Sequence, residues 1–242
     1  MDPTYASTYS DLYQRHWWWR AREPVIMDAL RRYRPATGWK SALDVGCGDG
    51  LFFGKLKEIA GRVEGIEADE GLVTEQGRAR GRIYPGPFDR SFQPGTTYSL
   101  IVMLDVLEHL ADPAAALSRA RELLEPGGTL LITVPAFRSL WTHHDDLNHH
   151  LTRYTREELA PLLRGAGLQV LESKYFFHWT VPAKLAVRFA EKTFRLPARP
   201  ARVPASWLNG LLYGFSRLEE QLLGWLRWRV GSSLLVVAER GE

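Results

Sequence analysis

The chain has almost no cysteine and no long apolar run. Its only cysteine is Cys47, which excludes an internal disulfide framework and is typical of a reducing compartment. No apolar run approaches the roughly 20 residues that span a bilayer, and the first residues lack the basic and apolar regions of a secretion signal. We therefore expect a cytoplasmic protein, with peripheral membrane contact as the alternative.

A large excess of charge of one sign is also missing. The 31 basic and 28 acidic residues leave a formal charge of +3, which is too small to indicate a nucleic-acid partner. We find no internal repeat and no low-complexity tract. A chain of 242 residues that is 45% hydrophobic can bury a sizeable core, and its length fits one large domain with an appended cap.

Between residues 41 and 134, short apolar segments alternate with helical patterns, which is typical of strand–helix–strand units on a parallel sheet. The strands expected from this pattern and its continuation are Ser41–Val45, Arg62–Glu67, Tyr98–Leu104, Thr129–Val134, Leu168–Phe177 and Ser232–Glu239. The helices expected between them are Leu51–Ala60, Glu70–Arg80, one that begins at Asp112-Pro113, and Thr155–Gly165.

Two stretches do not follow this alternation. We predict a single domain, 1–242, in which residues 1–37 form a helical leader or lid and 178–231 form a helical cap. Residues 38–177 form the core between them, and 232–242 the final strand. The cap carries a stripe of apolar residues at helical spacing, which we expect to pack on the sheet or on a second copy. The stripe consists of Leu208, Leu211, Leu212, Phe215, Leu218, Leu222 and Leu226.

A glycine-rich turn, Gly46-Cys47-Gly48-Asp49-Gly50, follows the first expected strand. Glycine lets backbone approach a ligand closely, and the amides of such a turn attract polar groups. Glu67 ends the second strand, nineteen residues after Gly48, where a carboxylate can accept hydrogen bonds from both hydroxyls of a ribose. The turn and the acid together indicate a nucleoside cofactor.

The nicotinamide fingerprint fits this turn poorly. That fingerprint has a third glycine where this chain has Leu51. Asp44, at the end of the first strand, would also lie close to a pyrophosphate. A cofactor that carries an ammonium and a sulfonium group tolerates the acid better.

Four motifs then occur in order: Leu43–Gly50, Gly65-Ile66-Glu67, Leu104–Leu110 and Leu124–Gly128. As a set they resemble the motifs of class I methyltransferases, in the broad branch that includes ubiquinone-type O-methyltransferases. The resemblance covers roughly residues 38 to 175. It implies an α/β fold with a doubly wound, Rossmann-like, seven-stranded, mostly parallel sheet, whose last strand is antiparallel and preceded by the helical cap.

The same resemblance implies S-adenosyl-L-methionine as the cofactor. Asp44 and the backbone of residues 46–50 would hold its methionine part, Glu67 its ribose, and the segment around Phe88 its adenine. The residues that we predict to bind the cofactor are Asp44, Gly46, Cys47, Gly48, Gly50, Glu67, Phe88 and Asp105.

Histidines and acids follow the fourth and fifth strands, where an acceptor should bind. We predict His144 or His150 as the base that takes the acceptor's proton, with Asp145 orienting one of them. Residues expected to contact the acceptor are Trp18, His109, Arg153 and Tyr154. A divalent metal is an open alternative, because Asp105-x-x-Glu108-His109 resembles a ligand set of some ubiquinone and small-RNA O-methyltransferases, to which His149 or His150 would add a ligand.

The sequence therefore predicts methyl transfer to an oxygen of a small or lipophilic acceptor. Transfer to nitrogen or carbon, or a non-catalytic module that binds S-adenosylmethionine and regulates a partner, remain alternatives, and the oligomeric state is open. Residues 182–229 also carry basic side chains interleaved with apolar ones, which is typical of peripheral membrane contact. Those basic residues include Lys184, Arg188, Lys192, Arg195, Arg199 and Arg202, against the single nearby acid Glu191.

Overall fold

The computed structural model describes residues 3–225 and 228–241. Met1, Asp2, Leu226, Arg227 and Glu242, which belong to the expected leader, cap and final strand, lie outside the described residues. Within the described ranges, no helix combines the length and the apolar character needed to cross a bilayer.

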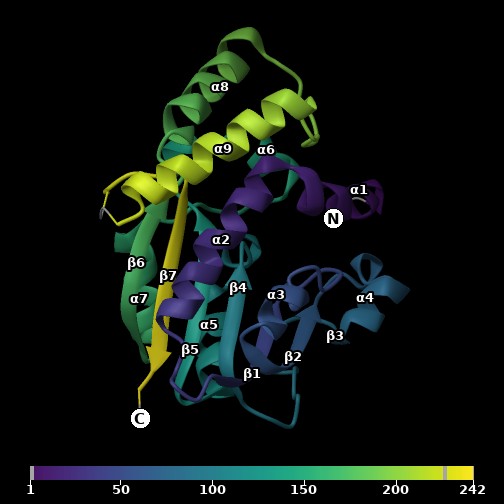
Figure 1. Ribbon diagram of the computed structural model, residues 1–242, viewed down its shortest axis with the longest axis vertical. Coiled ribbons are helices and arrows are strands. Elements are labelled where there is room, and N and C mark those ends of the chain that lie inside the picture. Colours follow the sequence, from purple (N-terminus) through teal and green to yellow (C-terminus); the bar gives the residue numbers. More distant parts are fainter. Residues whose placement is uncertain (1–2, 226–227, 242) are drawn as a thin grey trace.

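The described residues form a seven-stranded sheet in the order β3-β2-β1-β4-β5-β7-β6 (Figure 1). β7 pairs antiparallel with both of its neighbours, and the other pairs are parallel. The expected doubly wound sheet with an antiparallel last strand is confirmed. Its strands are β1 (Trp39–Val45), β2 (Ala60–Glu67), β3 (Arg82–Pro85), β4 (Tyr98–Leu104), β5 (Leu124–Pro135), β6 (Leu168–Phe176) and β7 (Ser233–Arg240).

Helix boundaries follow local capping chemistry. The Asp112 side chain accepts a hydrogen bond from the Ala115 N–H at 2.9 Å, and Pro113 begins the helix, as predicted. The helices are α1 (Pro3–Arg15), α2 (Trp17–Arg32), α3 (Phe53–Lys57), α4 (Glu75–Arg80), α5 (Pro113–Leu123), α6 (His143–Leu147), α7 (Arg156–Gly165), α8 (Thr180–Phe194) and α9 (Ser206–Leu223). Short 3-10 turns occur at η1 (Glu70–Leu72), η2 (Leu107–His109) and η3 (Arg138–Leu140).

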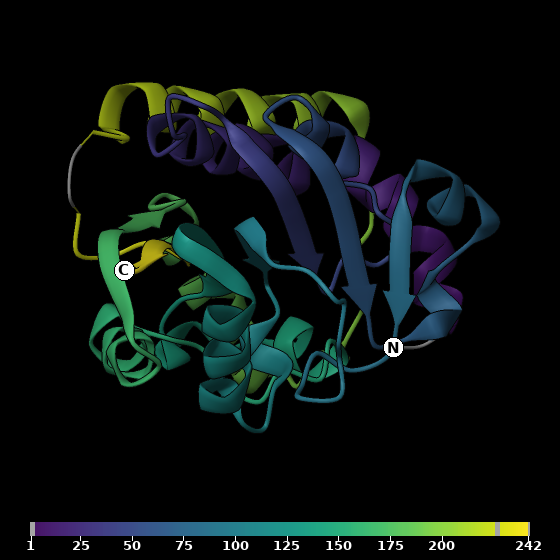
Figure 2. The same ribbon diagram turned by 90° about the horizontal axis from the view of Figure 1, so that it is seen from below.

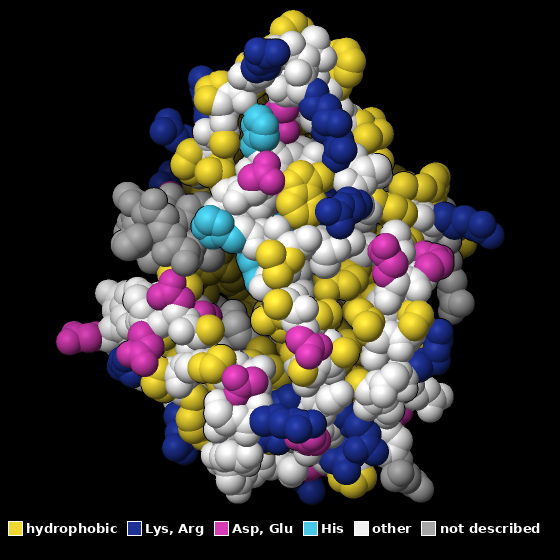
Figure 3. Space-filling view, turned by 180° about the vertical axis from the view of Figure 1, so that it is seen from behind, with side chains coloured by type: hydrophobic (Ala, Val, Ile, Leu, Met, Phe, Trp, Pro, Cys, Tyr) yellow, Lys and Arg dark blue, Asp and Glu magenta, His cyan; other side chains and the backbone are white. Residues whose placement is uncertain are grey.

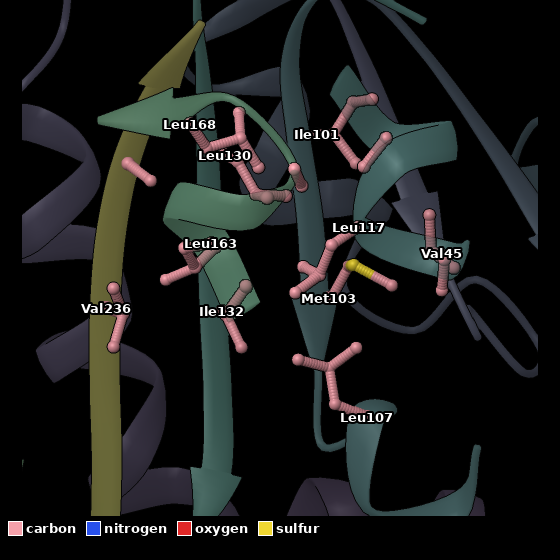
Figure 4. Packing of buried hydrophobic residues seen from close by; sticks show 14 of the residues in the cluster. Val45, Ile101, Met103, Leu107, Leu117, Leu130, Ile132, Leu163, Leu168 and Val236 are labelled. Atoms are coloured by element: carbon pink, nitrogen blue, oxygen red, sulfur yellow. The ribbon is translucent and has the colours of Figure 1, made fainter. Parts of the chain in front are cut away.

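Alternate side chains of the central strands divide the core into two layers. In β4, Ile101 and Met103 join the layer that α5 and α7 cover (Figure 4), whereas Leu100 and Val102 join the layer of α2 and α3. Figure 2 shows α2 against one face of the sheet and α9 on the outer side of α2. The central strands of the sheet are therefore covered on both faces.

Three elements of the structure differ from the sequence expectations. β3 has no counterpart among the predicted ranges, because only Ile83 of its four residues is buried. The helix expected at 51–60 shortens to the five residues of α3. The helix expected at 70–80 is interrupted, because Asp49 accepts hydrogen bonds from the backbone and hydroxyl of Thr74 and so holds Thr74 as the N-cap of α4.

Much of the apolar stripe expected in the cap is not covered by the sheet within the described residues, and packing on a second copy stays a prediction. In α9, Leu211, Phe215 and Leu222 are each at least half exposed. The helix instead turns its polar residues Asn209 and Ser216 inward, where both are buried.

Candidate active site

The glycine turn after β1 has a backbone that only glycine adopts readily. Gly46, Gly48 and Gly50 have φ angles of 68°, 52° and 66°. A Cβ on Gly46 would lie 2.8 Å from a methyl group of Val106, so a side chain there would displace the loop after β4. The turn is therefore fixed against both the end of β2 and the loop after β4, at the point between β1 and β4 where the strand order reverses.

Two carboxyl groups face this turn. Glu67 accepts hydrogen bonds from the backbone N–H groups of Gly48 (2.8 Å) and Asp69 (2.9 Å). Asp44 is buried, and burial together with the nearby Glu67 raises its pKa to about 8. The pair gives this edge of the sheet an acidic character that suits a cationic ligand better than a pyrophosphate.

The leader lies over the turn. The Tyr9 ring is 3.9 Å from the position that a Cβ on Gly48 would occupy. The buried Arg22 of α2 forms an ion pair with the partly exposed Asp105 at 2.9 Å and donates to the Thr133 hydroxyl at 2.5 Å. The guanidinium of Arg22 also lies 5.0 Å from the centre of the Trp18 ring. Asp105 and Trp18, predicted to bind cofactor and acceptor, are thus joined through Arg22, a residue that the sequence analysis did not identify.

Two further residues predicted to bind the cofactor lie at the side of this edge. The Cys47 thiol packs towards Gly65 and Phe53. The backbone of Cys47, and not its side chain, therefore lines the turn. Phe88 is partly buried, with its ring 6.0 Å from that of Phe92. The structure therefore brings Asp44, the turn and Glu67 together, with Phe88 in the loop that follows β3.

On the acceptor side, Asp145 is the centre of a buried cluster. Its carboxylate is 2.8 Å from His150 Nδ1 and receives two hydrogen bonds from Arg153, from Nε at 2.8 Å and from Nη2 at 2.9 Å. Burial alone would raise the pKa of Asp145, but the hydrogen bonds from His150 and Arg153 outweigh it and hold the pKa below its usual range. Asp145 therefore stays ionised and in contact with His150 Nδ1.

The other residues predicted here have different partners. Arg153 also donates to the Ala136 carbonyl, so its guanidinium holds Asp145 instead of projecting towards an acceptor. Burial lowers the pKa of His144 to about 4, and its ring is close to the Asn148 amide instead of Asp145. Tyr154 is buried in the core and donates to the Leu107 carbonyl at 3.2 Å.

A third cluster lies between the loop that follows β4 and the loop that follows β5. Glu108, His109 and His150 can each direct one ligand atom so that all three atoms lie within 4.8 Å of one another. Glu108 is fully buried, and neither carboxylate oxygen has a hydrogen-bond partner among the described residues. Burial, with a further contribution from Asp105, raises the Glu108 pKa well above its usual value, and burial lowers that of His109 to about 4.

The first turns of α8 also belong to this side of the molecule. Burial, together with the charge of Arg153, lowers the pKa of Lys184 to about 8. Arg188 donates to the carbonyls of Arg138 (3.0 Å) and Trp141 (3.1 Å). Arg188 therefore has partners within the chain, and the place of both residues in a basic membrane-facing surface stays a prediction. Figure 3 shows a hollow beside histidine side chains, with hydrophobic side chains visible inside it.

Comparisons with known proteins agree with this geometry. A family model described as a methyltransferase domain matches residues 18–173. A "Probable S-adenosylmethionine-dependent methyltransferase" of Mycolicibacterium smegmatis is 29% identical over 213 residues, which cover 85% of this chain and 80% of the relative. A ubiquinone biosynthesis O-methyltransferase of Ruegeria pomeroyi is 25% identical over 190 residues, which cover 67% and 75%. A solved S-adenosylmethionine-dependent methyltransferase from Thermotoga maritima shares the fold, with a TM-score of 0.61, 18% identity and coverage of 98% and 97%.

Proposed function

The chain belongs to the S-adenosylmethionine-dependent methyltransferases, and on that premise we propose that it methylates an oxygen of a small or lipophilic acceptor with His150 as the base. The observation that carries the proposal is the hydrogen bond between His150 and the buried Asp145. A hydroxyl acceptor must lose a proton as it reacts, so it needs a positioned base. The similarity to an O-methyltransferase of ubiquinone biosynthesis also supports oxygen as the methylated atom.

The Asp145–His150 pair can hold the imidazole ready to accept a proton. Because ionised Asp145 accepts a hydrogen bond from Nδ1, the neutral ring carries its proton there and leaves Nε2 free to accept one. The acceptor oxygen attacks the methyl carbon as the carbon–sulfur bond breaks. The cofactor, when bound, would supply the methyl group and leave as a neutral thioether, and His150 Nε2 would take the hydroxyl proton.

The cofactor would bind beside the glycine turn. We propose that Asp44 faces its ammonium group, that Glu67 accepts hydrogen bonds from its ribose, and that Phe88 contacts its adenine. Trp18 and Tyr9 of the leader would close over it and exclude water. Support comes from the two buried acids and from the position of Tyr9 against Gly48.

Metal-assisted transfer is the second candidate, and a specific observation favours it. The two unpartnered oxygens of Glu108 lie in a group with His109 and His150 that has the oxygen and imidazole donors of a divalent-metal site. A bound divalent ion would lower the pKa of the acceptor hydroxyl. His150 Nε2 would then hold the metal and could not also take the proton, so the two mechanisms exclude each other.

The proposal is tested with cofactor labelled with carbon-13 on its methyl group. The protein is incubated with aqueous and organic extracts, protein and nucleic acid in separate reactions, and the carbon chemical shift of the transferred methyl identifies the methylated atom. We expect label on an oxygen of a small or lipophilic molecule, and none on nucleic acid. Cofactor binding with no labelled product would instead indicate the regulatory module.

The same assay separates the two mechanisms. If a chelator leaves the rate unchanged, the metal is not required. If the chelator abolishes transfer, a divalent ion restores it, and Glu108→Gln cannot be restored in this way, the metal-assisted mechanism replaces the base mechanism.

A further inference from the structure

The outer surface of α8 and α9 is apolar and has no cover within the described residues. We define the α8–α9 face by Phe189, Phe194, Trp207, Leu211, Leu222 and Trp225, whose exposed fractions run from 59% to 77%. Large apolar patches on a protein surface usually mark a contact with a partner or a membrane.

The exposed apolar residues of α9 lie along one face of the helix over its whole length. Residues 207, 211, 218 and 222 follow one another at spacings of four, seven and four, so they lie on one face. The opposite face carries Asn209, which bonds with the junction of α1 and α2, and Ser216, which accepts from the Trp179 indole. α9 thus packs through its polar side and presents its apolar side outward, the reverse of an ordinary surface helix.

Charge on the same surface is of one sign. Residues 180–230 contain nine basic residues and three acids. The acids turn back to the protein: Glu191, Glu219 and Glu220 are held by His143, Trp179 and Lys174, respectively. The basic residues exposed at the two ends of the apolar stripe are Lys192, Arg195, Arg199, Arg202 and Arg229. Hydrophobic and Lys or Arg side chains accordingly gather at the end of the molecule where α8 lies (Figures 1 and 3).

We propose that the α8–α9 face docks on an anionic lipid bilayer. Exposed tryptophan and phenylalanine side chains would enter the interfacial region while the basic side chains meet anionic headgroups. A second copy of this chain fits less well, because a two-fold interface would bring the same five basic residues together from both sides. Docking does not depend on which acceptor is methylated, so it can hold or fail independently of the proposed function.

Vesicle sedimentation tests the proposal directly. The full chain is spun with vesicles of phosphatidylglycerol and phosphatidylcholine, and with vesicles of phosphatidylcholine alone, at low and high salt. We expect binding to the anionic vesicles that weakens as salt rises, and much weaker binding to the neutral ones. No binding to anionic vesicles at low salt, or equal binding to both compositions, would overturn the proposal.

Two variants identify the surface. Replacing Lys192, Arg195 and Arg199 by Glu should lower partitioning into anionic vesicles by at least about 100-fold, because each basic residue near such a surface contributes substantially. The matched control replaces Lys40, Arg78 and Arg90 by Glu, which changes the net charge equally at exposed sites away from the face and should lower binding far less. Trp207→Ser combined with Leu211→Ser should weaken binding without changing the fold, because both side chains are exposed.

Three outcomes contradict the assignment of the face. Equal losses in the two charge-reversed variants would mean that net charge alone drives binding. Unchanged binding in the serine variant would show that the apolar stripe takes no part. A dimer in sedimentation velocity that the serine variant dissociates would show that a second copy covers the face.

Discussion

Asp44 and Glu67 are two acids at neighbouring strand ends that we propose select the cofactor. Both are buried at the carboxyl edge of the sheet, and burial together with the charge of Glu67 disfavours the ionised form of Asp44. A cationic ligand relieves this repulsion, whereas a pyrophosphate would add to it. The free protein therefore binds a proton at Asp44 that a cationic cofactor should displace.

This predicts that S-adenosylmethionine binding releases a proton. Free Asp44 has a pKa of about 8, and the cofactor's ammonium should favour its ionised form. The free state then holds more protons than the complex below pH 8, so affinity should rise with pH, about tenfold from pH 6 to pH 7. Calorimetry at pH 6.5 in two buffers of different ionisation enthalpy should show release of close to one proton. Asp44→Asn should abolish the release, and its persistence in that variant would assign the proton to another group.

Glu67→Ala should weaken cofactor binding by about 1.5–3 kcal/mol, the range of a charge-assisted hydrogen bond. Titration calorimetry measures the loss. Glu70→Ala provides the control, since Glu70 is a nearby exposed acid, and its affinity should match that of the unaltered protein. A Glu67 variant with full affinity would show that another group holds the ribose.

At the scale of single residues, the sequence predicted which side chains lie near one another but not which partners they contact. The spacing of Asp145 and His150 in one loop was sufficient to suggest a pair, and the structure brings their side chains together. Arg153 was expected to face the acceptor, yet it holds Asp145. The position of Lys184 depends on where α8 meets the rest of the chain, which no local pattern encodes.

Single contacts also decide how whole helices meet. Asn209 of α9 accepts from the Trp17 N–H at 2.9 Å and donates to the Arg15 carbonyl at 2.8 Å. One buried side chain thus satisfies the start of α2 and the end of α1. This contact joins the cap to the leader that lies over the glycine turn.

Asn209→Ala should lower the free energy of unfolding by about 1–3 kcal/mol, because it leaves the part-buried Trp17 N–H and Arg15 carbonyl without this partner. Urea denaturation measures the change, and hydrogen exchange should increase in α1 and α9. Gly210→Ala is the matched control in the next position of the same helix: its new Cβ meets nothing within 4 Å, so it should be neutral or stabilising by up to about 1 kcal/mol. An Asn209 variant as stable as the control would contradict the bridge.

Elements were predictable where a long pattern or a cap marked them. Asp112 and Thr155 start α5 and α7 as expected, since both use capping chemistry that is visible in the sequence. β3 and the break before α4 depend on a strand neighbour and on Asp49, which are distant in the chain. The apolar face of α9 points outward, whereas a surface helix usually buries its apolar face. Periodicity therefore predicted the helix but not which of its faces is buried.

For the whole molecule, cofactor binding should raise the free energy of unfolding and the melting temperature. A ligand present at 100 times its dissociation constant stabilises the native state by about 2.7 kcal/mol, which for a chain of this size raises the melting temperature by roughly 5–11 °C. Thermal unfolding should shift upwards with S-adenosylmethionine and with its demethylated product. NAD should cause no shift, and a shift with NAD alone would refute the cofactor assignment.

Single-turnover methyl transfer in His150→Gln tests the central claim most directly, once the labelled-methyl assay has supplied an acceptor. We expect a transfer rate lower by about 10²–10⁴ with cofactor affinity unchanged. Asp145→Asn should lose less, because it keeps the His150 imidazole and removes only the charge that holds it. His149→Asn, an exposed neighbour with a backbone that asparagine tolerates, should transfer at the normal rate. Full activity in His150→Gln, or a loss confined to His144→Gln, would contradict the assignment of His150 as the base.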